Sequence, residues 1–252
     1  MSFPLAVPLK AGMEKDTTST NRRGRSIGTR GIMPDGREFV WSKAAATAII
    51  TGALCQQQAT SATYDADIAV ATAEAAGSVS IGLTNAGATL AVNTFQYGFM
   101  HVNDVDGEGH NYLIKSHTAA TTTQGITVTL AEDDGIKVAL TTSSQVGLRK
   151  HPYDAVIIYP TTLTGIPIGV TPIAITASHY FWMQTYGSCT ALSDAVIGIT
   201  GQPVVPSFSV AGAVRVQPKV YTTSGNRAVA GMWQNISVST EYGLIFLTLG
   251  SR

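Results

Sequence analysis

The residues best suited to chemistry lie in one acidic segment, residues 101–110 (HVNDVDGEGH). Asp104, Asp106 and Glu108 are spaced by two, so on a strand their carboxylates would share one face and could hold a divalent cation. The segment does not fit an EF-hand loop, because the twelfth position counted from Asp104 is a lysine where that loop needs Glu. Acidic, glycine-containing segments between strands are usually turns, so we expect a surface loop and no metal site.

Other sequence signatures of catalysis are missing. The five histidines are scattered, and none belongs to an H-E-x-x-H motif or to a cysteine or serine motif. The chain has no G-x-S-x-G and no G-x-x-x-x-G-K-[ST], and Gly107 and Gly109 do not open a helix after a strand. A triad assembled from distant residues would leave no local signature. On these patterns we expect no enzymatic activity and no cofactor.

Composition excludes several classes of protein. The 252 residues include 16 Lys+Arg and 16 Asp+Glu, are 13% charged and 44% hydrophobic, and contain 25 Gly. This composition is too apolar for a disordered chain and too neutral for a strongly basic nucleic-acid binder. Near-zero net charge promotes association, so we expect neighbouring subunits.

Membrane, secretion and disulfide signals are weak. No stretch reaches the roughly 18 apolar residues of a membrane helix. Residues 1–13 lack a basic start followed by an apolar run, so they do not resemble a signal peptide, and we expect synthesis in the cytosol. Cys55 and Cys189 are far apart in the sequence, and we expect two buried free thiols, although one disulfide stays open.

The elements that would position these residues are strands. Runs rich in Thr, Val, Ile, Tyr and Phe recur between Gly, Asn, Asp and Pro. In residues 125–130, Ile126, Val128 and Leu130 alternate with two threonines, which predicts a strand with one buried face. The only helix candidates, residues 42–50 and 65–76, contain β-branched residues and could also be strands. We therefore predict an all-β fold, a β-sandwich or barrel-like domain or domains.

Composition also suggests a division of the chain. Residues 32–160 form a hairpin-rich first β region, and residues 161–252, richer in Pro and Gly, form a second one packed on the first. Residues 1–31 are expected to be an extended basic N-terminal arm, because residues 17–31 (TTSTNRRGRSIGTRG) have no acid and no apolar periodicity. The alternatives are a solvated terminus, an arm ordered by a neighbouring subunit and, more weakly, a nucleic-acid arm.

The strongest single segment is the aromatic run at residues 179–187 (HYFWMQTYG). On a strand, Tyr180 and Trp182 face one way and Phe181 and Met183 the other, so both faces must be covered. The run fits the core of the second β region. It also fits a subunit interface, where Trp, Tyr and Met are enriched.

Five motifs occur in a familiar order: PDGREF (34–39), GEGHNYLI (107–114), YFWMQTYG (180–187), VAGAV (210–214) and YGLIFL (242–247). With them the chain resembles the structural proteins encoded beside the major capsid gene of tailed bacteriophages, called head decoration or cement proteins. The resemblance runs from about residue 22 to the C-terminus.

The resemblance implies a β-rich homotrimer that binds the major capsid protein on the virion exterior and braces the shell, with no nucleic-acid or membrane partner. The alternative is a phage tail or receptor-binding β protein that recognises host glycans. The residues proposed to contact the capsid or other subunits are Arg22, Arg23, Arg25, Arg30, Arg37, Tyr180, Trp182 and Tyr186.

Overall fold

The computed structural model describes residues 6–21, 25–59, 63–85, 87–131, 135–194, 199–218, 227–235, 237–238 and 240–250. These residues form eighteen β-strands and one short 3-10 helix, and no α-helix occurs among them. The all-β prediction is confirmed. Of the two helix candidates, residues 42–50 hold only the end of a strand, and residues 65–76 contain strand β6 (Ile68–Ala69).

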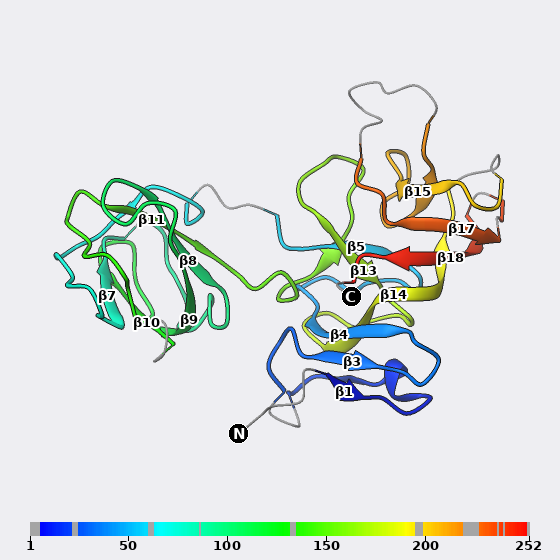
Figure 1. Cartoon of the computed structure of the whole chain (residues 1–252), viewed down its shortest axis with the longest axis horizontal. Helices are drawn as coiled ribbons and strands as arrows, with labels where there is room; N and C mark the ends of the chain where they lie inside the picture. The colour runs from blue at the N-terminus through cyan, green and yellow to red at the C-terminus, as the bar shows by residue number, and fades with distance from the viewer. Residues whose placement is uncertain are drawn as a thin grey trace. The chain divides into compact units, whose positions relative to one another are not determined.

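The chain divides into two compact units (Figure 1). Unit 1 consists of residues 1–59 and 152–252, and unit 2 of residues 60–151. Unit 2 is inserted between β5 (Leu54–Gln56) and β12 (Ile157–Ile158), which pair antiparallel. That pairing brings the two ends of the insertion close together, so a whole domain can take the place of a hairpin loop. The division differs from the border near residue 160 that composition suggested.

Unit 2 is a small barrel. Its sheet order is β6-β11-β8-β9-β10-β7. The ring closes between β6 and β7, where Val70 bridges Leu83 and the Ala71 N–H donates to the Gly82 carbonyl at 2.8 Å. The other strands are β7 (Ser80–Leu83), β8 (Phe99–Asp104), β9 (Asn111–His117), β10 (Ile126–Leu130) and β11 (Gln145–Arg149).

The barrel core has the alternation expected from the sequence. Ile126, Val128 and Leu130 are at most 1% exposed, whereas Thr127 between them is exposed. They pack with residues contributed by all six strands of the barrel. Period-two burial on β10 therefore places the apolar face inside and the threonine face in water.

Unit 1 is built on a large sheet in the order β1-β3-β4-β14-β18-β17-β15-β16. Its longest strand, β14, pairs with β4, β18, β2 and β13 and so links most of the unit. The bounds are β1 (Val7–Pro8), β2 (Thr17–Thr18), β3 (Arg30–Ile32), β4 (Glu38–Lys43), β13 (Pro167–Val170), β14 (Tyr180–Leu192), β15 (Pro203–Pro206), β16 (Val214–Val216), β17 (Gly231–Asn235) and β18 (Tyr242–Thr248). A 3-10 helix, η1 (Met13–Lys15), lies between β1 and β2.

Residues 6–21 do not extend away from this sheet as the arm prediction required. Strand β1 pairs in parallel with β3, and β2 pairs with the start of β14. Leu9 is only 2% exposed and packs with Phe39, Trp41 and Trp182. The expectation relied on charge and on missing periodicity, and a few isolated apolar side chains are enough to anchor a segment that adds strands to a sheet.

Candidate functional site

The acidic segment forms an exposed turn between β8 and β9, as expected. Asp104, Asp106 and Glu108 are all exposed. The Thr141 hydroxyl donates a hydrogen bond to Asp106 Oδ2 at 2.9 Å, and the Val105 N–H donates to Asp104 Oδ1 at 2.9 Å. In the part of the chain that the structure describes, no group of three or more His, Cys, Asp or Glu residues is placed to hold a metal ion.

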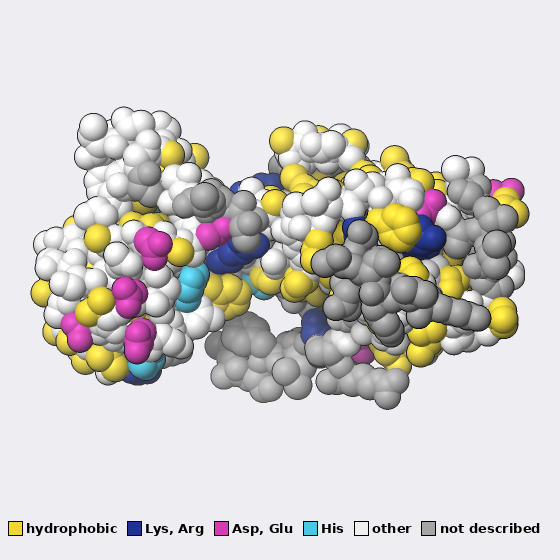
Figure 2. All heavy atoms as spheres, turned by 90° about the horizontal axis from the view of Figure 1, so that it is seen from above, with side chains coloured by type: hydrophobic (Ala, Val, Ile, Leu, Met, Phe, Trp, Pro, Cys, Tyr) yellow, Lys and Arg dark blue, Asp and Glu magenta, His cyan; other side chains and the backbone are white. Residues whose placement is uncertain are grey.

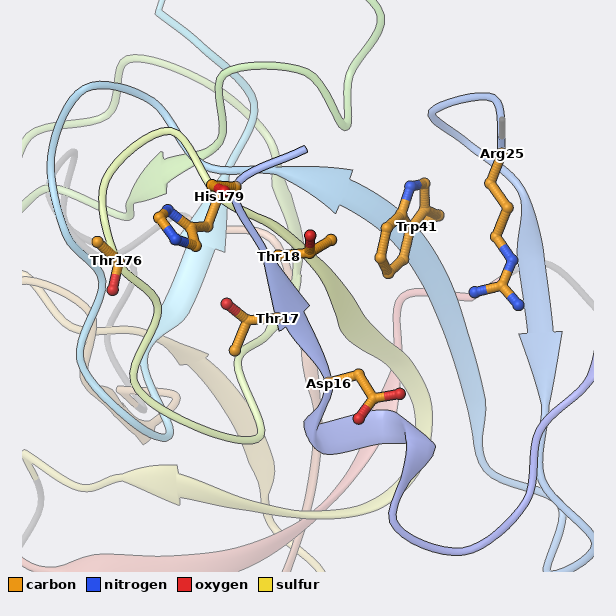
Figure 3. A pocket seen from close by; sticks show the side chains of 8 residues that line it. Asp16, Thr17, Thr18, Arg25, Trp41, Thr176 and His179 are labelled. Atoms are coloured by element: carbon orange, nitrogen blue, oxygen red, sulfur yellow. The ribbon is translucent and has the colours of Figure 1, made fainter. Parts of the chain in front are cut away.

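A polar cleft of about 460 Å³ opens beside β2 and the start of β14. Figure 3 shows His179 and Thr176 on one side of it and Trp41 and Arg25 on the other, with Thr17 and Thr18 between them. Thr18 is opposite Tyr180 in the β2–β14 ladder, so this pairing sets the floor of the cleft. The lining residues are Asp16, Thr17, Thr18, Ser19, Arg25, Trp41, Thr176 and His179.

Two indole rings hold Arg25 at the edge of this cleft. The guanidinium carbon lies 5.6 Å from the Trp41 ring centroid and 5.2 Å from that of Trp182. Tyr180 stacks on Trp41 at 6.2 Å with an interplanar angle of 14°. Trp41 is 4% exposed, and its Nε1–H donates to Asn21 Oδ1 at 3.3 Å. The ring therefore positions the arginine by cation–π attraction and has little surface left for stacking on a ligand.

The polar wall of the cleft carries several hydrogen-bonding groups. His179 Nδ1 lies 3.0 Å from the Ala177 carbonyl, and because a carbonyl oxygen only accepts, Nδ1 carries a proton and donates it. Among the described residues, no hydroxyl of the cleft is hydrogen-bonded to His179, so no nucleophile and base are paired. One carboxylate, one guanidinium and several hydroxyls can instead hydrogen-bond a polar group such as a polyol or an extended peptide.

The residues proposed to contact the capsid or other subunits differ in their exposure and in the partners that they already have. Arg30 pairs with Glu38 at 2.8 Å, and Arg37 pairs with Asp35 at 2.7 Å. The Arg37 N–H, followed by its guanidinium, lowers the pKa of Asp35. Tyr180 is half-buried, with the Lys43 ammonium 5.3 Å from its ring centroid. Arg22 and Arg23 lie outside the described residues.

Trp182 was predicted to contact the capsid or another subunit, and the structure shows that this prediction is wrong. Its side chain is 0% exposed and packs in the cluster of Leu9, Phe39 and Trp41. It cannot touch another subunit while unit 1 is folded. The aromatic run at this point is core, because β14 has apolar side chains on both faces and both faces are covered.

Tyr186 belongs to an apolar strip that the sequence analysis did not identify. The strip runs over one face of β14, β18 and β17 and consists of Tyr186, Met232, Tyr242, Leu244 and Phe246. Met232 is opposite Phe246 in the ladder, and the Tyr186 and Phe246 rings meet edge to face at 5.2 Å. We call this set the outer strip.

The outer strip exposes apolar side chains on one sheet face of unit 1. Tyr242 is 47%, Met232 45% and Leu244 39% exposed. On β18, the alternate residues Ile245 and Leu247 are fully buried against the core. The signal in the sequence was the run YGLIFL, which is apolar at both phases of the period-two pattern.

Comparison of the chain with protein-family models, with curated proteins and with solved structures gave no match. None of the helices in the described residues is long and apolar enough to cross a membrane.

Proposed function

We propose that the chain is a non-enzymatic structural protein of tailed-bacteriophage heads, which binds the outer surface of the shell and bridges major capsid subunits. The observation that carries the proposal is the outer strip, because contiguous exposed apolar side chains on a soluble protein mark interaction surfaces. The resemblance of the five motifs to head decoration proteins implies the major capsid protein as the partner and the capsid exterior as the location.

The rigid backbone under the outer strip suits a protein that stabilises a shell by binding to it. Its side chains stand on hydrogen-bonded strands, so little backbone order has to be created when a partner binds. The resemblance implies a homotrimer, in which three strips would bind the shell together. Multivalent attachment raises the overall affinity by orders of magnitude without any new contact.

The second candidate is a tail or receptor-binding protein that recognises host glycans, and the polar cleft favours it. Asp16, Arg25 and the threonine hydroxyls supply the hydrogen bonds that a sugar requires. The covered faces of Trp41 weigh against it, since stacking of a sugar on an open aromatic ring is not available there. We therefore favour the shell.

The test uses particles assembled without the chain, to which purified protein is added back. We expect the protein to co-sediment with heads, and Met232→Ser with Leu244→Ser to weaken binding by about tenfold or more, as for apolar residues at the centre of an interface. Val92→Ser is the matched control, because Val92 is 61% exposed and belongs to unit 2, whereas the strip consists of unit 1 residues.

Two results would overturn the proposal. If the Met232→Ser, Leu244→Ser variant bound heads as tightly as the wild-type protein, the outer strip would not be the surface that binds the shell. Imaging that places the added protein only on tails would favour the glycan-binding alternative, which a Thr18→Ala variant in the cleft would then probe.

A further inference from the structure

Unit 1 has a second cavity, of about 280 Å³, beside the η1 turn. Its lining comes mainly from η1, from β14 and from the turn after β13, and every lining residue belongs to unit 1. The volume lies just below the range of about 300–1,000 Å³ that is usual for ligand pockets. The cavity therefore suits a molecule of few atoms.

Glu14 of η1 places a buried carboxylate at this cavity. The residue is only 6% exposed, and its Oε2 accepts the Gly12 N–H at 2.7 Å. No other hydrogen bond and no ion pair involves this carboxylate within the part of the chain that the structure describes. Taking a carboxylate out of water is costly unless it is paired and hydrogen-bonded, so Oε1 lacks the cationic donor that its burial calls for.

Gln184 of β14 adds a second acceptor. It is 3% exposed, and its Nε2 donates to the carbonyl oxygens of Tyr186 at 3.1 Å and Ser188 at 2.9 Å. Because a carbonyl oxygen only accepts, these two bonds fix the orientation of the amide and leave Oε1 on its other side. Over the described ranges of the chain, nothing donates to that oxygen. Two side-chain acceptors that line the cavity therefore each have a place for a donor.

One cation that lines the same cavity has no partner. Lys15 is exposed, and its ammonium forms no ion pair or hydrogen bond with any residue that the structure describes. Arg37 also lines the cavity, but its Nε is paired with Asp35 at 2.7 Å. Charged residues are only 13% of the chain, and on the face of unit 1 shown in Figure 2 they are few among many apolar side chains. A buried acid and an unpaired cation at one small cavity are therefore a local concentration of charge.

We propose that this cavity binds a small apolar α-amino acid as its zwitterion. The α-ammonium has three N–H donors, enough for both Glu14 Oε1 and Gln184 Oε1. The carboxylate of the ligand would pair with the ammonium of Lys15, whose flexible side chain can adjust to reach it. Val170 and Leu244 contribute the apolar part of the lining, against which a side chain such as that of leucine would pack.

Charge balance favours a zwitterion over ligands of a single charge. A ligand with only a carboxylate would pair with Lys15 but would bring a second negative charge to the buried Glu14. A ligand with only an ammonium would satisfy Glu14 and leave Lys15 unpaired in solvent, so it should bind more weakly. A metal ion would find no group of three His, Cys, Asp or Glu ligands in the described part of the chain.

The experiment is isothermal titration calorimetry of the purified full-length protein with four related ligands. L-Leucine carries both charges, 4-methylpentanoate lacks the ammonium, 3-methylbutylamine lacks the carboxylate, and N,N,N-trimethyl-L-leucine keeps the positive charge without an N–H donor. We expect L-leucine to bind with a dissociation constant of about 1 mM or lower. The ligands without N–H donors should bind about tenfold or more weakly, and 3-methylbutylamine about threefold more weakly, because the pair that it loses is exposed.

Two variants assign the contacts. Glu14→Gln keeps an acceptor for the Gly12 N–H and removes the charge, so it should weaken L-leucine binding about tenfold or more. Lys15→Gln should weaken L-leucine binding about threefold and leave the binding of 3-methylbutylamine unchanged, since that ligand has no carboxylate. Lys10→Gln is the matched control and should bind like wild type, because Lys10 is also exposed and does not line the cavity.

No binding of L-leucine at about 10 mM would overturn the inference. So would 4-methylpentanoate binding as tightly as L-leucine, or a Glu14→Gln variant with the wild-type melting temperature that binds L-leucine as well as the wild type does. The comparison of ligands uses the wild-type protein, so it decides the matter even if Glu14→Gln does not fold. This test contains no phage particle, so its failure leaves shell binding untouched, and failure of shell binding leaves this site untouched.

Discussion

Replacing Leu130 with Ala should lower the melting temperature of unit 2 and leave that of unit 1 unchanged. Leu130 is 0% exposed and is opposite Ile114 in the β9–β10 ladder. Every member of its hydrophobic cluster lies between residues 64 and 148, whereas the other clusters consist of unit 1 residues only. The cavity left by the lost side-chain atoms should therefore destabilise one unit.

The size of the effect follows from burial. Deleting a fully buried leucine side chain costs about 3–4 kcal/mol, against a total stability of about 5–14 kcal/mol for a domain of this length. With about 4–8 °C lost for each kcal/mol in so small a domain, the unit 2 transition should fall by roughly 12–30 °C.

Differential scanning calorimetry of the full chain is the assay. The matched variant is Leu247→Ala, which removes an equally buried leucine from the core of unit 1 and should move the other transition. If both variants lowered a single shared transition, the two units would unfold as one cooperative block and the reasoning from separate cores would be refuted.

Three further predictions test local features. Gly147→Ala should destabilise unit 2 by about 2 kcal/mol or more in urea unfolding. An added Cβ at Gly147 would meet the Asp65 carbonyl oxygen, whereas one at Gly82 would make only ordinary contacts. A harmless Gly147→Ala together with a harmful Gly82→Ala would contradict this packing. Cys55 and Cys189 should resist iodoacetamide at about pH 8 until the chain is unfolded, and rapid labelling of either thiol in the native protein would contradict this. Burial raises the pKa of the Cys55 thiol and raises that of Cys189 to about 12. The contribution of these buried thiols to stability is therefore present below the pKa of an unfolded thiol and is lost as pH rises. Unit 2 should lose stability as pH falls below about 6.5, because burial lowers the pKa of His117, whose Nε2 accepts the Phe95 N–H at 2.9 Å. At such a pH the unfolded histidine binds a proton and the folded one does not. In a plot of the urea midpoint against pH, His117→Gln should reduce the loss at acid pH without abolishing it, since burial also lowers the pKa of His151.

Local patterns predicted local structure well. The alternation at Ile126, Val128 and Leu130 identified both the strand and its buried face. The aromatic run of β14 was recognised as a strand covered on both sides, and the burial of Trp182 follows from that covering. These features depend on neighbours within a few residues, whose side-chain spacing can be read directly from the chain.

Long-range pairing could not be predicted in the same way. Gln56 is opposite Ile157 although all of unit 2 lies between them in the sequence, and no local pattern predicts that these two positions pair. The Ala-rich stretch at residues 65–76 has helix formers, yet Ile68 and Val70 complete the barrel, because closing the sheet outweighs a weak local propensity. The N-terminal strands were missed for the same reason, since Val7 and Thr17 gain their partners only from distant strands.

Domain boundaries change the meaning of the composition. Taken over the whole chain, zero net charge predicts association through the lack of repulsion, and such association should strengthen as salt screens what repulsion remains. Divided at residues 59 and 151, the same residues form a unit of +5 (twelve Lys+Arg, seven Asp+Glu) and a unit of −5 (four and nine), and association between unlike units should weaken with salt. The sign of the salt dependence therefore separates an unspecific sticky surface from a directed contact, and it can be measured on the wild-type protein before any variant is made.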